Sequence, residues 1–146
     1  MKKLIALLLI LVVAVLPTAC DSSEKIPDII YIKGTPYSTT MTKLSLHSLK
    51  ITNEDLEPLR YMTNLEKLNI GDNAIDDISV LSELTNLDML RMHQNNVSNL
   101  SALSGLTNLR ELWLFDNPVS EEQIAELQAA LPDCVIVNVP VRRGER

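Results

Sequence analysis

The chain has 146 residues, with 13 Lys and Arg against 19 Asp and Glu, and a net charge of −6. This length accommodates one domain, whose usual size is about 100–150 residues. The acidic balance disfavours binding to nucleic acid, which requires a basic surface, and adsorption to anionic lipid.

The first 19 residues have the three parts of a secretory signal peptide. The basic start, Met1-Lys2-Lys3, precedes an apolar run from Leu4 to Leu16, and small residues follow as far as Ala19. This run is shorter than the about 20 apolar residues of a membrane-spanning helix. We therefore interpret residues 1–19 as a signal peptide and expect export from the cytoplasm.

Cys20 follows this segment directly, and a polar stretch comes after it. The junction from Leu16 to Cys20 resembles a bacterial lipoprotein signal, although Pro17 stands where that family usually has Leu. The resemblance implies that the Cys20 thiol is lipidated, with residues 20–28 as a tether, on the extracytoplasmic face of the cell membrane. More than one acyl chain gives durable anchoring. The alternative is ordinary cleavage nearby, which releases a secreted protein.

Residues 29–42 contain an apolar stretch, Ile29–Lys33, followed by Gly34 and then Pro36-Tyr37-Ser38. We interpret them as a strand and a turn that cover the N-terminal end of the following domain. That domain spans residues 43–138.

A pattern with a period of 22 residues fills this domain. Thr-Asn-Leu opens three blocks, at residues 63–65, 85–87 and 107–109. The aligned positions that follow are Leu68, Leu90 and Leu112, then Ile70, Met92 and Leu114, then Asn73, Asn95 and Asn117, then Ile75, Val97 and Val119. This spacing is the leucine-rich-repeat signature, in which stacked coils bury each other's apolar edges. A longer first block, from Leu44 to Leu59, has Leu49 in place of the Asn.

Each repeat contains a short strand, because Leu68 and Ile70 alternate with polar positions. The Asn that follows lies where the chain leaves the strand, and its amide can both donate and accept. We expect Asn73, Asn95 and Asn117 to form a structural ladder that begins in the second coil. The remaining half of each coil returns along the outer side and buries residues such as Ile78 and Leu81.

The C-terminal end of the domain has the signals of a capping helix. Ser120 and Gln123 form a capping box, Ile124, Leu127 and Leu131 make one apolar stripe, and Pro132 ends the helix. Val135-Ile136-Val137 is then expected to close the sheet as its last strand. Residues 139–146 are interpreted as a flexible tail.

With its lipoprotein-like start, the chain resembles bacterial internalin-type leucine-rich-repeat proteins over roughly residues 42–138. The resemblance implies an α/β solenoid with a short curved parallel sheet on the concave side and tight or 3-10 helical turns on the convex side. An N-terminal strand and a C-terminal helix are expected to cap it.

The resemblance also implies that exposed strand residues of the concave sheet bind a partner. In this chain the predicted partner-binding residues are Asn69, Met89, Arg91, His93, Glu111, Trp113 and Phe115. Trp and Arg are enriched in interface hot spots, and this Trp and this Phe are the single ones of the chain. The alternative is that Trp113 and Phe115 only pack beside the closing strand.

We expect no catalytic, metal or cofactor site. His47 and His93 lie two strands apart, about 9–10 Å at the usual strand spacing, whereas zinc needs three or four converging donors. Cys134 lies in an apolar stretch and is interpreted as an inert core thiol. No Ser-His-Asp or Cys-His arrangement indicates a hydrolase.

The sequence therefore favours a protein–protein interaction module held outside the cytoplasm by a lipid on Cys20. It predicts a protein partner, and neither nucleic acid nor a small-molecule substrate. The alternative function is a structural envelope scaffold or spacer without a specific ligand.

Overall fold

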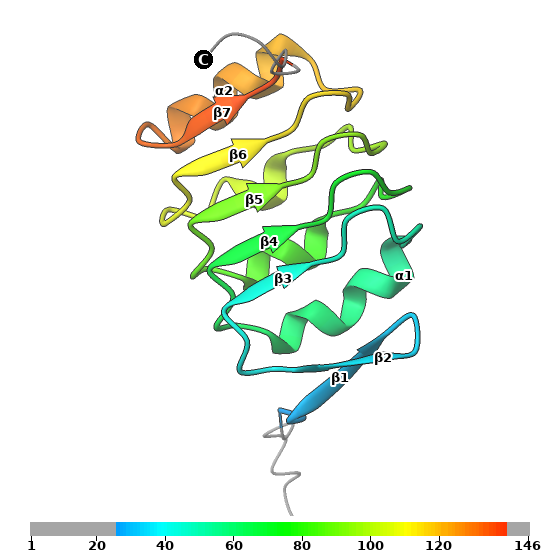
Figure 1. The fold of residues 1–146 in the computed structure, drawn as a ribbon. Coiled ribbons are helices and arrows are strands. Elements are labelled where there is room, and N and C mark those ends of the chain that lie inside the picture. Colours follow the sequence, from blue (N-terminus) through cyan, green and yellow to red (C-terminus); the bar gives the residue numbers. More distant parts are fainter. Residues whose placement is uncertain (1–25, 140–146) are drawn as a thin grey trace, which may run out of the picture.

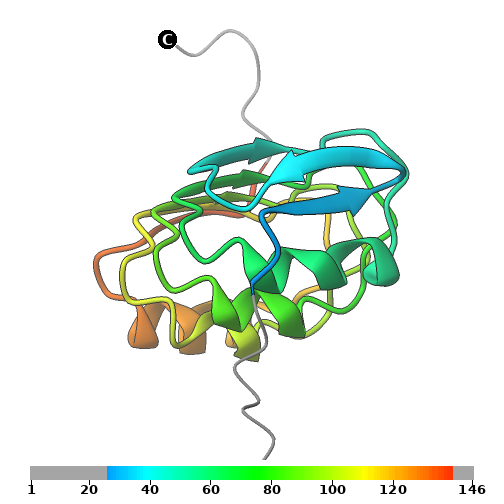
Figure 2. The same ribbon diagram turned by 90° about the horizontal axis from the view of Figure 1, so that it is seen from below.

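The structure, a computed structural model, describes residues 26–139. The predicted signal peptide, Cys20 and residues 140–146 lie outside this range. The described chain winds into a stack of coils with a five-stranded parallel sheet on one side, in the order β3-β4-β5-β6-β7 (Figure 1). The short helices form a second layer behind the sheet (Figure 2). None of the helices in this range is long and apolar enough to span a membrane.

The elements follow the predicted repeat. The strands are β1 (Ile29–Ile32), β2 (Thr35–Ser38), β3 (Lys43–Ser45), β4 (Lys67–Asn69), β5 (Met89–Arg91), β6 (Glu111–Trp113) and β7 (Val135–Val137). The helices are α1 (Asn53–Leu56) and α2 (Glu121–Ala130), and the 3-10 helices are η1 (Glu57–Tyr61), η2 (Ser79–Glu83) and η3 (Ser101–Leu103). The predicted leucine-rich-repeat fold, with 3-10 turns opposite a parallel sheet, is confirmed.

The 22-residue period sets the register of the sheet, because equivalent residues of successive repeats are paired on neighbouring strands. Leu68, Leu90 and Leu112 are paired on neighbouring strands without a shift, and all three are buried. Their side chains point to one face because successive strand residues alternate in direction. Ile78 and Leu81, on the returning half of a coil, are also buried. Each coil therefore supplies one layer to a continuous core.

Three asparagine side chains tie each coil to the one before it. Asn95 donates from Nδ2 to the carbonyls of Met92, in its own coil, and Ile70, in the preceding one, both at 3.0 Å. Its Oδ1 accepts from the amide of Ile75 at 3.1 Å. Asn73 and Asn117 make the corresponding bonds, both within their own coils and to the preceding coils. These amides satisfy backbone groups that the turn would otherwise bury without partners.

The longer first block contains a true α-helical turn. Thr52 and Asp55 form a capping box at the start of α1, and η1 follows directly. Leu49, which stands at the ladder position of this block, is 45% exposed. Its backbone amide donates to Oδ1 of Asn73 from the next coil. The extra residues are thus absorbed on the helical side, and the register of β3 with β4 is unaffected.

The N-terminal cap is a hairpin, where the sequence predicted one strand and a turn. β1 pairs antiparallel with β2, and Lys33 and Gly34 connect them with φ of 50° and 76°. Positive φ at both central residues suits a two-residue hairpin loop. Ile30 and Ile32 are buried against the first coil, and Lys33 forms an ion pair of 2.9 Å with Asp55 of α1.

The C-terminal cap is the predicted helix and strand. Ser120 and Gln123 form the capping box of α2, and Leu127 and Leu131 are buried. Gln128 donates to the carbonyls of Leu131 and Cys134, which links the end of the helix to the start of β7. β7 then pairs with β6 and forms the last strand of the sheet.

Candidate functional site: the open sheet face

The strand side chains that point away from the core form one surface, which we call the open sheet face. The register aligns them in three rows across the strands. The first row is Lys43, Lys67, Met89, Glu111 and Val135; the second is Ser45, Asn69, Arg91, Trp113 and Val137; the third, one step beyond the strands, is His47, Gly71, His93, Phe115 and Val139. All seven residues predicted to bind a partner lie on this surface.

The aromatic residues of the face form one connected group. Trp113 and Phe115 have ring centroids 6.2 Å apart, and the Phe115 ring stacks on His93 with centroids 4.7 Å apart. The guanidinium of Arg91 lies 4.8 Å from the Trp113 ring centroid, within the range of a cation–π contact. The structure therefore brings together residues that are up to 24 positions apart in the sequence. Trp113 and Phe115 are each partly buried.

Glu111 contacts both Trp113 and Arg91 of this group. Its carboxylate accepts a hydrogen bond from Nε1 of Trp113 and lies 3.7 Å from Nη2 of Arg91. The Nε atom of Arg91 is buried, and no described residue accepts its proton. A buried donor without a partner costs free energy, so the Arg91 side chain carries an unsatisfied hydrogen-bonding group at this position.

His47 and His93 are closer than the sequence predicted. The expected separation of about 9–10 Å is the distance between their strands, but the ring centroids are 5.6 Å apart. The rings approach because Gly71 between them has no side chain. A Cβ on Gly71 would lie 2.5 Å from Cε1 of His93, and the Gly71 carbonyl accepts from Nδ1 of His47 at 2.8 Å.

The environment of His93 favours its neutral form. Burial lowers the pKa of His93 below its usual value, and the nearby positive charges of His47 and Arg91 add to this effect. Its Nδ1 is buried and has no hydrogen-bond partner among the described residues. Within residues 26–139, no three His, Cys, Asp or Glu side chains are placed to hold a metal ion.

Sequence reasoning missed the contribution of the last strand. Val135 and Val137 extend the first two rows, and Val139 follows in line with Phe115. Val135 and Val139 are 64% and 70% exposed. The signal was available, because the expected β7 has the same alternation as the other strands. These valines make the C-terminal half of the face apolar.

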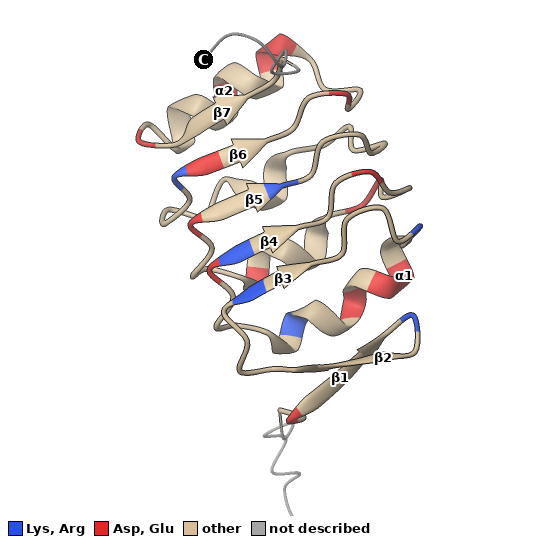
Figure 3. Ribbon diagram, in the orientation of Figure 1, with Lys and Arg blue, Asp and Glu red and all other residues tan. Residues whose placement is uncertain are grey.

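The N-terminal half of the face is basic and hollowed. A depression of about 300 Å³ is lined by Lys43, Ser45, Lys67, Asn69, Met89 and Arg91. Figure 3 shows basic residues at the starts of β3 and β4 and at the end of β5. We call this depression the basic notch.

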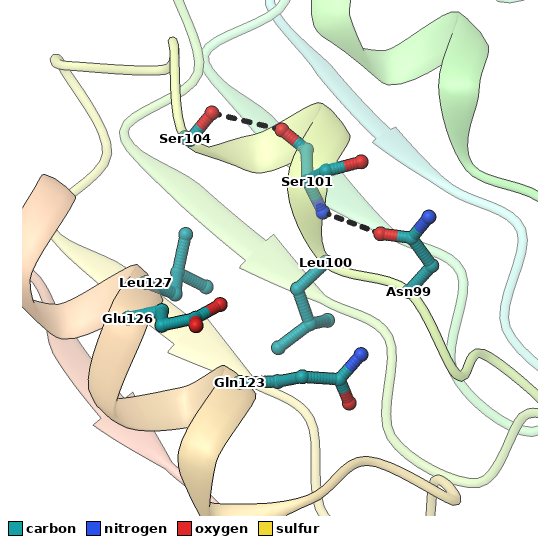
Figure 4. A pocket seen from close by; sticks show the side chains of 7 residues that line it. All are labelled: Asn99, Leu100, Ser101, Ser104, Gln123, Glu126 and Leu127. Carbon is teal, nitrogen blue, oxygen red and sulfur yellow. Dashed lines mark hydrogen bonds between the residues drawn. The ribbon is translucent and has the colours of Figure 1, made fainter.

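A second hollow, of about 270 Å³, lies on the helical side between η3 and α2 (Figure 4). Most of its polar residues take part in hydrogen bonds. Asn99 accepts from the Ser101 amide, the Ser104 hydroxyl donates to the Ser101 carbonyl, and Gln123 donates to the carbonyl of Ser98. With these groups satisfied, this hollow offers less to a ligand than the open sheet face.

Cys134 is a free, buried cysteine. It is buried at the start of the last coil, and burial raises the pKa of its thiol. A raised pKa keeps the thiol protonated and poorly nucleophilic.

Comparisons with known proteins agree with this architecture. The family described as Leucine Rich repeats (2 copies) matches residues 85–129. An internalin (inlF) of Listeria monocytogenes has a similar solved structure, with a TM-score of 0.63 and 33% identity over 74% of this chain. Internalin C2 of the same organism gives a TM-score of 0.57 with 28% identity over 69% of this chain. The functional domain of InlJ, also from that organism, gives 0.59 with 27% identity over 72%.

The chain is much shorter than these neighbours. It spans 32% of the inlF chain, 53% of the internalin C2 chain and 22% of the InlJ chain. No curated protein matches it significantly. Leucine-rich-repeat solenoids generally use their sheet surface to bind other proteins. The repeats and the structural neighbours together support a bacterial leucine-rich-repeat protein.

Proposed function

We propose that this chain is a protein-binding module, rather than an enzyme, displayed outside the cytoplasmic membrane of a bacterium and anchored by a lipid on Cys20. The single observation that carries the binding proposal is the connected group of Arg91, His93, Trp113 and Phe115 on the open sheet face. Aromatic and Arg side chains dominate the energetics of protein interfaces. A solenoid without a ligand has no need to place them on the solvent side of its sheet.

The size of the face limits how it binds. Five strands at about 4.8 Å, with about 17 Å of exposed length each, give roughly 400 Å², whereas a standard interface buries about 800 Å² per partner. The partner therefore contacts the flanking loops as well, or binding is weak and depends on many copies in one membrane. Confinement to a membrane raises the effective concentration and supports the second mode.

A capture experiment tests the binding surface. The full chain, expressed in a bacterium and immobilised by its N-terminal end, is exposed to envelope extract, and retained proteins are identified by mass spectrometry. We expect Arg91→Ala/Trp113→Ala to lose the retained protein while its circular dichroism spectrum is unchanged. The matched control Arg60→Ala/Tyr61→Ala removes the same kinds of side chain from the helical side and is expected to retain it. Equal capture by both folded variants would favour the scaffold function.

The anchor has a separate test. Cys20→Ala in the full chain is expected to move the protein from the membrane fraction to the soluble extracytoplasmic fraction. Mass spectrometry of the parent is expected to show a diacylated N-terminal cysteine. An unmodified Cys20 would contradict the anchor and leave the binding proposal intact.

A further inference from the structure

We infer that the open sheet face binds an acidic segment of a partner protein, whose carboxylate binds in the basic notch and whose apolar residue packs on Trp113, Phe115 and Val137. This inference rests on the proposed binding function and adds the chemistry of the partner. It joins the two halves of the face into one composite site.

The two lysines of the basic notch have no ion-pair partner in the described part of the chain. Lys43 and Lys67 occupy paired positions on β3 and β4, about 4.8 Å apart along the sheet. Like charges on paired positions destabilise a sheet. Neither ammonium group lies within 4.0 Å of a carboxylate in the described part of the chain. A bound carboxylate would relieve this repulsion.

Arg91 supplies the third cation and a directed donor. Its guanidinium is positioned by Trp113 and Glu111. A carboxylate in the notch can accept a charge-assisted hydrogen bond from the guanidinium of Arg91, whose side chain is 39% exposed. Met89 and Asn69 also line the notch, and the volume of about 300 Å³ accommodates a side-chain carboxylate with its methylene groups.

The surroundings of the notch favour a discrete carboxylate over a polyanion. Glu66 and Asp88 immediately precede β4 and β5, Asp72 and Asp116 follow the third row, and the chain has a net charge of −6. A nucleic acid or a phosphate polymer extending beyond the notch meets these negative charges. A protein segment can place one carboxylate on the lysines and continue with neutral residues.

The geometry also sets the spacing of the partner's residues. Lys67 and Trp113 are two strands apart and one row apart, so their backbones are separated by about 12 Å. An extended peptide advances about 3.3 Å per residue. The acidic and the apolar residue of the partner are therefore expected about three to four positions apart.

A random 12-residue peptide library displayed on phage, selected on the immobilised full chain, tests this inference. We expect enriched peptides to carry Asp or Glu three to four residues from an aromatic or aliphatic residue. Lys43→Glu/Lys67→Glu is expected to weaken these peptides at least tenfold and to select basic peptides instead. Lys50→Glu/Arg60→Glu, with the same change in net charge outside the face, is expected to leave them unchanged.

The outcomes separate this inference from the proposed function. Enriched peptides that need Trp113 but contain no acidic bias would overturn the acidic partner and keep the binding face. Peptides indifferent to Trp113→Ala and Phe115→Ala, or no enrichment at all, would overturn both. Displacement of the peptides by inorganic polyphosphate at equal charge, with no contribution from their apolar residue, would show that the notch is a polyanion site.

Discussion

The two sides of the sheet obey different rules. The inward positions repeat almost unchanged in every coil, with Leu68, Leu90 and Leu112 in one column. The outward positions paired beside them change completely, from Asn69 to Arg91 to Trp113. Stacking demands an apolar group of similar size on the inner side of each coil, whereas the outer side is free of that demand. Changes on the inner side are therefore expected to affect stability, and changes on the outer side to affect binding.

The largest effect is expected from Leu90→Ala compared with Met89→Ala on the same strand. Leu90 is fully buried, so its truncation leaves a cavity and costs about 3–4 kcal/mol of the free energy of unfolding. Met89 lies on the open sheet face, and its truncation is expected to cost less than about 1 kcal/mol. Urea unfolding measures both. Equal losses would contradict the division between the two sides.

The asparagine ladder is expected to contribute to stability as the buried apolar residues do, although its side chains are polar. Asn95→Ala removes bonds to two coils and leaves buried carbonyls and an amide without partners, which costs about 3 kcal/mol. The neighbouring Asn96→Ala, on an exposed side chain, is the control and is expected to change little. Thermal unfolding of the pair gives the comparison. A small loss for Asn95→Ala would mean that water replaces the amide.

Gly71→Ala tests a position on the outer side of the sheet where the structure has no room for a side chain. The new Cβ would collide with the His93 ring, so the ring moves outward and stability falls by about 1–2 kcal/mol. We also expect the pKa of His93 to rise towards its usual value, because burial is the main cause of its lowering. An NMR titration of the histidine resonances measures this. An unchanged pKa of His93 in this variant would contradict the close approach of the His93 ring to Gly71.

A smaller, stabilising effect is expected from Gln94→Gly. Gln94 and Asp72 follow their strands with a φ of 55°, a left-handed conformation that Gly adopts without strain. We expect a gain of about 0.5–1 kcal/mol at Gln94 and less at Asp72→Gly, because Asp tolerates this conformation better than Gln does. Chemical denaturation of both variants checks the order. A loss at Gln94 would show that its side chain makes contacts that outweigh the backbone strain.

The smallest effect is expected from pH through His93. Its pKa is lowered in the folded chain from a usual value of 6.5, so the unfolded chain takes up the proton first as the pH falls. The contribution of His93 is complete above pH 6.5 and decreases as the pH falls towards the lower folded pKa. We expect stability to fall more between pH 7.5 and 5.5 in the parent than in His93→Gln. If the stability of the two proteins changes with pH in the same way, His93 is not the source of the pH dependence.

The features that come from local chemistry and repetition were predictable. The 22-residue period predicted the stacked strands because a coil that cannot bury its own apolar edge needs identical neighbours. The rows of the open sheet face followed from the same register. The capping box of Ser120 and Gln123 depends only on a spacing of three residues.

Other features depend on contacts between coils that no single segment contains. The approach of His47 to His93 depends on a missing side chain one strand away, at Gly71. The contacts among Arg91, Trp113 and Glu111 depend on their side-chain rotamers, which packing between neighbouring strands determines. One further difference is local: β2 pairs with β1 in a hairpin, where the sequence predicts one strand and a turn.

The sequence alone determined the solenoid, its C-terminal cap and the exposed rows from β3 to β6, because apolar burial repeats with a period that can be read along the chain. Only the tertiary structure decided that these rows divide into a basic notch and an apolar half. Side-chain packing across strands is set by distances in space, and residues 22 positions apart in the chain become direct neighbours in the sheet.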